Sequence, residues 1–99
     1  MTSPSYRVVW LYTVRPVWLG HLLIDLGARG ESSDTVFEAM DRVTAELTRD
    51  PESYGESRED GTRIYCDPVL TVIYEVHPDD HLVLVVRAHY VRRPRNPAG

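Results

Sequence analysis

Two apolar stretches near the end of the chain constrain the fold most strongly. Val69–Val76 and His81–Val91 are rich in β-branched and aromatic residues, which favour strands. The segment between them, His77-Pro78-Asp79-Asp80, has the composition of a tight turn. Strands joined by so short a turn lie antiparallel, so the sequence predicts a hairpin. The second strand is apolar at consecutive positions through Val86, which indicates a central or well-covered strand.

Two further strands are predicted earlier in the chain. Tyr6–Tyr12 is aromatic and β-branched, and Thr62–Asp67 has the same character until Pro68 interrupts it. The segment Glu52–Gly61 is polar and acidic, and we expect it to be a loop.

Two helices are expected between these strands. The first starts near Pro16 and ends at Gly27 or Gly30. The second follows the capping residues Ser32–Asp34 and stops before Pro51. Its apolar positions have the spacing of one helix face: Val36, Met40, Val43 and Leu47. The order β-α-α-β-β-β predicts an α+β fold, with a helical hairpin packed on a mainly antiparallel four-stranded sheet.

The length and the cysteine content limit the class of protein. A chain of 99 residues suits a single domain spanning 1–99, and the proline-rich end predicts a flexible tail at 92–99. The one cysteine, Cys66, rules out a disulfide-stabilised secreted scaffold. No stretch approaches the ~20 apolar residues of a membrane span, and Met1–Ser5 lacks the features of a signal peptide. We therefore expect a cytoplasmic protein without a membrane partner.

Charge is unevenly distributed along the chain. The net charge is −4, and residues 31–80 carry fourteen acidic residues against four arginines. The last nineteen residues contain no acid and four arginines: Arg87, Arg92, Arg93 and Arg95. An acidic protein is a poor general binder of nucleic acid, because contact with phosphate drives that affinity. A basic end can still bind nucleic acid locally, or bind an acidic partner.

The apolar run of the last strand ends in three polar residues, Arg87, His89 and Tyr90. By strand alternation Arg87 and His89 share a face with Val83 and Val85, whereas Tyr90 points away. Histidine can exchange a proton near neutral pH, and arginine can stabilise a charged phosphate. RNA cleavage through the 2′-hydroxyl needs such groups. The alternative interpretation is a half-buried strand end with a structural role.

Arg63 is a second candidate for binding a phosphate. It shares a strand face with Tyr65 and Asp67, and pairing in a meander would project Arg63 and Arg87 from one surface. His77, His81 and the two aspartates between them resemble metal ligands in composition, but an exposed turn explains them better.

These features together resemble the RelE/ParE superfamily of bacterial toxins. The resemblance lies in the element order and in short motifs that follow one another: Leu-Thr-Arg-Asp-Pro at 47–51, Gly-Glu-Ser-Arg at 55–58, Gly-Thr-Arg-Ile-Tyr at 61–65, Val-Ile-Tyr-Glu-Val at 72–76 and Leu-Val-Val-Arg-Ala-His-Tyr at 84–90. The last motif is similar to the Arg-any-His-Tyr ending of the YoeB branch.

The resemblance implies roles for residues at the chain end. His89 would be the proton donor of an mRNA endoribonuclease, Tyr90 its neighbour in the site, and Arg87 a supporting cation. Arg63 and Tyr65 fall near lysines that the RelE branch uses.

The chain also departs from the family pattern. Thr71 stands where these nucleases usually have a basic residue, and Arg92 and Arg93 would partly replace the missing charge. Glu56 and Glu59 are candidates for the glutamate base.

Three functions remain open under this resemblance. The protein is a ribosome-dependent mRNA endonuclease, a ParE-like toxin that binds DNA gyrase without cutting RNA, or a non-toxic binding protein on the same scaffold. The expected partner is a cognate antitoxin, with self-association into a homodimer as a further expectation. No cofactor and no metal site is expected.

Overall fold

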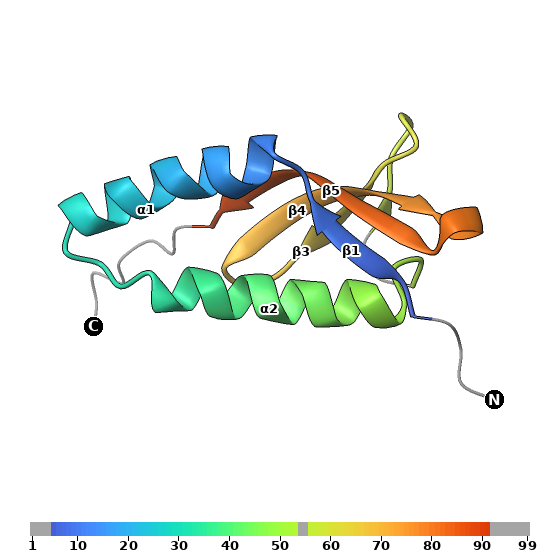
Figure 1. The fold of residues 1–99 in the computed structure, drawn as a ribbon, viewed down its shortest axis with the longest axis horizontal. Coiled ribbons are helices and arrows are strands. Elements are labelled where there is room, and N and C mark those ends of the chain that lie inside the picture. Colours follow the sequence, from blue (N-terminus) through green and yellow to red (C-terminus); the bar gives the residue numbers. More distant parts are fainter. Residues whose placement is uncertain (1–4, 54–55, 92–99) are drawn as a thin grey trace, which may run out of the picture.

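The computed structural model describes residues 5–53 and 56–91. Its elements are, in order, β1 (Arg7–Trp10), η1 (Thr13–Trp18), α1 (Leu19–Ala28), α2 (Asp34–Arg49), β2 (Glu56–Ser57), β3 (Arg63–Cys66), β4 (Leu70–His77), η2 (Pro78–Asp80) and β5 (Leu82–Tyr90). The predicted α+β fold is confirmed, with two helices on a mostly antiparallel sheet (Figure 1). Among the described residues, no helix has both the length and the apolar character needed to cross a membrane.

The sheet has five strands in the order β1-β5-β4-β3-β2. β1 runs parallel to β5, and the other neighbours are antiparallel. β5 is therefore a central strand, as its continuous apolar run predicted. The expectation of four strands missed β2, which lies in the predicted loop and has only two residues. Both residues of β2 are polar and exposed, so they leave no alternating apolar pattern to detect.

The first helix begins after a break in the backbone. β1 ends at Trp10, two residues earlier than expected, and the chain turns into η1. Arg15 interrupts η1 with an extended conformation (φ −125°, ψ 99°), which a residue preceding a proline prefers. α1 then runs antiparallel to α2 (Figure 1), and Gly30 ends the turn after α1 with a φ of +71°.

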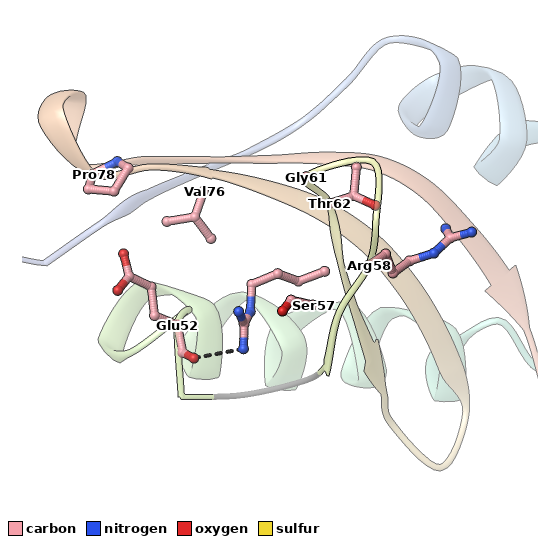
Figure 2. Close-up of a pocket in the computed structure, with 8 residues that line it drawn as sticks. Glu52, Ser57, Arg58, Gly61, Thr62, Val76 and Pro78 are labelled. Carbon is pink, nitrogen blue, oxygen red and sulfur yellow. Dashed lines mark hydrogen bonds between the residues drawn. The ribbon is translucent and has the colours of Figure 1, made fainter.

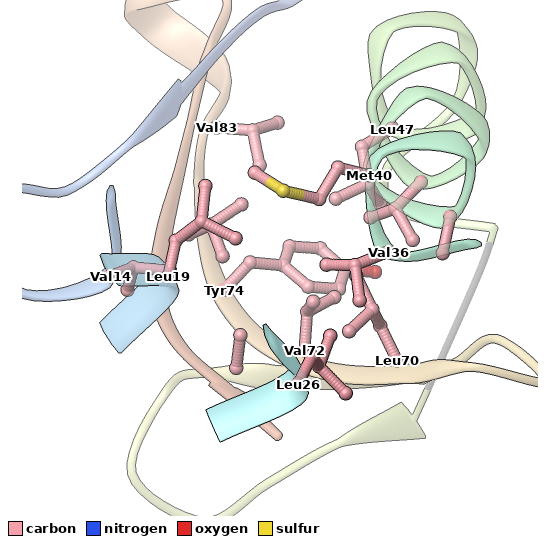
Figure 3. Packing of buried hydrophobic residues seen from close by; sticks show 14 residues of the cluster. Val14, Leu19, Leu26, Val36, Met40, Leu47, Leu70, Val72, Tyr74 and Val83 are labelled. Atoms are coloured by element: carbon pink, nitrogen blue, oxygen red, sulfur yellow. The ribbon is translucent and has the colours of Figure 1, made fainter. Parts of the chain in front are cut away.

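One hydrophobic cluster joins both helices to one face of the sheet (Figure 3). The predicted stripe of α2 is buried, and β4 and β5 contribute alternate residues: Leu70, Val72, Tyr74, Val83, Val85 and Ala88. Tyr74 is fully buried, and its hydroxyl donates a hydrogen bond to the carbonyl oxygen of Pro51 at 2.7 Å. Burial raises the pKa of the Tyr74 hydroxyl, with the nearby Arg63 acting in the opposite direction.

Asp67 connects α2 to the turn between β3 and β4. Its buried carboxylate accepts two hydrogen bonds of 3.0 Å from the Arg42 guanidinium and one of 2.9 Å from the backbone N–H of Val69. Burial alone would raise the pKa of Asp67, but the hydrogen bonds from Arg42, Val69 and Leu70 outweigh it and lower that pKa.

A β-bulge between β4 and β5 decides which way the end of β5 faces. Ile73 pairs with Arg87 and Tyr74 pairs with Val85, so Val86 is an extra residue. Val83 and Val85 point toward the helices, and after the bulge Ala88 does so as well. The prediction that Arg87 and His89 share the face of Val83 and Val85 is therefore wrong. They lie on the face of the sheet opposite the helices, which we name the open face.

Candidate functional site

Arg87 and His89 are both exposed on the open face. They are two residues apart on one strand, so their Cα atoms are separated by about 7 Å. Strand register extends the Arg87 position into a row across the sheet, from Arg87 to Ile73, Ile64 and finally Glu56. Directly opposed residues in neighbouring strands point to the same side, so Glu56 also belongs to the open face.

Among the residues that the structure describes, the row that contains His89 holds no arginine. His89 pairs with Thr71, which in turn pairs with Cys66. Thr71 is the position where the resemblance calls for a basic residue, and the structure gives the open face a hydroxyl there. Arg7 also lies on this face, but it pairs with Leu82 at the far end of β5.

Tyr90 does not lie on the open face with His89. It pairs with Leu70 and packs against the hydrophobic cluster, so its ring is on the helix side of the sheet. There it lines a separate hollow together with Arg42 and Val69. The sequence prediction that Tyr90 points away from Arg87 and His89 is confirmed, which divides the predicted cluster between two surfaces.

Arg63 and Tyr65 also lie on the helix side. Arg63 pairs with Tyr74, and its guanidinium donates a hydrogen bond to the backbone carbonyl of Glu52 at 2.8 Å (dashed line in Figure 2). Tyr65 is partly buried against the hydrophobic cluster. The expectation that Arg63 and Arg87 project from one surface is wrong, because strand register places them on opposite faces.

A hollow of about 330 Å³ surrounds Arg63 at the β2–β3 hairpin (Figure 2). Glu52, Arg58 and Thr62 contribute to its lining. It is on the far side of the sheet from His89, so it is separate from the exposed pair Arg87 and His89, which we name the open-face cluster.

The two candidate glutamates occupy different places. Glu56 stands on β2 within the Arg87 row, whereas Glu59 lies in the following turn beside Arg58 and Asp60. Glu56 is therefore the better candidate for a base acting with the open-face cluster. The sequence could not distinguish the two glutamates, because the strand that orients Glu56 was not predicted.

His77, His81 and the aspartates between them do not form a metal site in the part of the chain that the structure describes. There, no three His, Cys, Asp or Glu residues are grouped so that they could hold a metal ion. His77 is hydrogen-bonded to Glu75 at 3.0 Å, with both side chains on the open face toward the start of β5. Arg92, Arg93 and the predicted tail at 92–99 lie outside the described residues.

The contact between η1 and the end of β5 was not predicted from the sequence. Thr13, Val14 and Trp18 of η1 line one hollow together with the β5 segment 86–89. A tryptophan in this chain is expected either in the core or as the anchor of an interface, and Trp18 packs partly against the hydrophobic cluster. Its position beside Arg87 depends on the turn after β1, which the sequence pattern placed later in the chain.

Comparisons with known proteins agree with this fold. No protein-family model matches the sequence, and no curated protein matches it. A chain in the crystal structure of the toxin–antitoxin complex RelBE2 from Mycobacterium tuberculosis superposes with a TM-score of 0.65 at 20% sequence identity. The match covers 88% of this chain and 99% of that chain. The chain therefore has the RelE-like α+β fold that its sequence motifs indicated.

Proposed function

We propose that the protein is the toxin of a RelE-like toxin–antitoxin pair and that it cleaves mRNA on the ribosome. The observation that carries the proposal is the joint exposure of Arg87 and His89 on the open face, with Glu56 in the same row as Arg87. The RelBE2 complex supports the toxin–antitoxin setting, because a chain of that complex shares this fold over nearly its whole length.

The three side chains can divide the chemistry of RNA cleavage among them. Glu56 would accept the proton of a ribose 2′-hydroxyl, and His89 would donate a proton to the departing 5′-oxygen. Arg87 would stabilise the charge that develops on the phosphate. Neighbouring strands are about 4.8 Å apart, so three strand spacings separate Glu56 and Arg87 by about 14 Å at Cα. The proposed substrate is an RNA strand that crosses the sheet between them.

The experiment is expression of the protein and its variants, with primer-extension mapping of mRNA in the same cells. We expect translation arrest with discrete cleavage sites, lost in His89→Ala and Arg87→Ala by about 10²-fold or more. Arg7→Ala is the matched control, because it removes an exposed arginine from the same face at the other end of β5. Cleavage that persists in both His89→Ala and Arg87→Ala would refute the assignment.

An antitoxin is the proposed protein partner. The last residues of the chain supply arginines and no acid, so we propose that an acidic antitoxin segment binds at this end. Electrostatic attraction between exposed charges weakens with salt, so association should slow as ionic strength rises. An association rate that does not change with salt would contradict this mode of binding.

Thr71 favours a second candidate function. Thr71 pairs with His89 and supplies a hydroxyl where a second positive charge would assist Arg87, so we expect a weaker phosphate site than in a nuclease with a basic residue there. A toxin that binds DNA gyrase through this scaffold would not need that charge. Induction of DNA-damage signalling without mRNA cleavage would support gyrase binding, and harmless expression would support a non-toxic binding protein.

A further inference from the structure

A hollow opens beside the second half of β5, where β1 no longer pairs with it. The parallel ladder ends at Trp10 and Val85, and the chain then turns away into η1. Between η1 and the β5 segment 86–89 lies a space of about 380 Å³ that is open to solvent. Small-molecule sites span about 300–1,000 Å³, so the hollow can admit a flat ring system.

The lining of this hollow combines an aromatic ring with a cation. Trp18 contributes an indole that is only partly buried, and Val14 and Ala88 form an apolar floor. Arg87 is exposed beside them, and no carboxylate lines the hollow among the described residues. Proteins that bind single-stranded nucleic acid use this combination: bases stack on aromatic side chains, and arginine contacts the phosphates.

We propose that this hollow binds one base of a single-stranded RNA against Trp18, with the adjoining phosphate at Arg87. The identification of RNA as the ligand rests on the proposed function, since the same Arg87 and His89 border the hollow and serve the cleavage chemistry. An acidic peptide could pair with Arg87, but it would leave the apolar floor and the indole unused. The base would fix the register of the RNA on the open face.

Fluorescence of Trp18 tests the site without requiring cleavage. The chain has two tryptophans, and Trp10 is held elsewhere by a hydrogen bond to the Thr44 hydroxyl at 3.0 Å. In a Trp10→Phe protein, Trp18 is the only reporter. A short single-stranded oligoadenylate, added at low ionic strength, should quench it saturably. Adding Arg87→Ala should weaken binding by about tenfold, the loss of one hydrogen bond to a charged group.

Matched variants keep the test decisive if one of them folds poorly. Measured with labelled oligoadenylate, Trp18→Leu should bind about 5- to 100-fold more weakly, the range expected for one stacked base, while Trp18→Phe keeps most of the affinity. Arg7→Ala should bind like the parent, because Arg7 lies on the open face outside the hollow. Thermal melting of each variant shows whether the fold is retained.

Three results would overturn the proposal. These are no quenching of Trp18, equal RNA affinity in a folded Trp18→Leu protein, and stronger binding of a poly-glutamate peptide than of the oligoadenylate. The last result would identify the hollow as a site for an acidic protein segment. Cleavage in cells is scored separately: RNA binding without cleavage refutes only the proposed function, and cleavage without binding at Trp18 refutes only this site.

Discussion

Replacing Asp67 should destabilise the fold more than replacing any exposed aspartate. The Asp67 side chain is 3% exposed and accepts hydrogen bonds from Arg42, Val69 and Leu70. Hydrogen bonds to a charged group contribute about 1.5–3 kcal/mol each, but the Arg42 side chain is 48% exposed and regains water when its partner is removed. We therefore expect Asp67→Ala to cost about 2–4 kcal/mol, less than the sum of its bonds.

Chemical and thermal unfolding measure this cost. A loss of 2–4 kcal/mol should lower the melting temperature of a domain of this size by about 10–25 °C. Asp79→Ala is the control, since Asp79 is exposed in the η2 turn. Arg42→Ala should destabilise less than Asp67→Ala, because the backbone N–H groups of Val69 and Leu70 still pair with the carboxylate. Equal stability of Asp67→Ala and Asp79→Ala would refute the reasoning.

Acid should remove the contribution of Asp67. Its pKa is lowered in the folded protein, so its stabilisation is fully present above the unfolded value of about 3.9 and is lost as pH falls through the folded value. The difference in unfolding free energy between the wild type and Asp67→Asn should therefore be constant near neutrality and shrink below about pH 4. A difference that grows on acidification would show that the pKa is raised instead.

Four further changes test the fold. Tyr74→Phe should cost about 1–3 kcal/mol in denaturant titrations, because it leaves the buried Pro51 carbonyl without its donor. Deleting Val86 should leave cooperative unfolding intact in the same titrations, since Tyr74–Val85 and Ile73–Arg87 would become consecutive regular pairs that keep Arg87 and His89 on the open face. In thermal melts Gly20→Ala should stabilise by about 0.5–1 kcal/mol, as a Cβ there has open space within α1. Gly30→Ala should destabilise by about 1 kcal/mol, because its φ is +71°.

Elements with a strong apolar period were predictable, and those without one were not. α2 was predicted within a residue at each end because Val36, Met40, Val43 and Leu47 repeat at helical spacing between clear stop signals. β2 was missed because its two residues are strand only by virtue of their partners Ile64 and Arg63. With β2 missed, the sequence could not show that Glu56 belongs to the open face.

For the candidate site, too, the local sequence pattern predicts some features, whereas others depend on pairing with distant residues. Arg87 and His89 are recognisable as a polar end to an apolar strand, and their shared face follows from alternation alone. Which face that is depends on one extra residue in β5, set by how Ile73 and Tyr74 pair with it. Valine is favoured on both faces of a strand, so the identity of residue 86 does not predict a bulge at that position. The bulge exposes Arg87 and His89 and leaves Tyr90 on the helix side. The nuclease chemistry proposed for Arg87 and His89 must therefore operate without Tyr90, and Trp18 is the aromatic residue that lines the hollow beside Arg87.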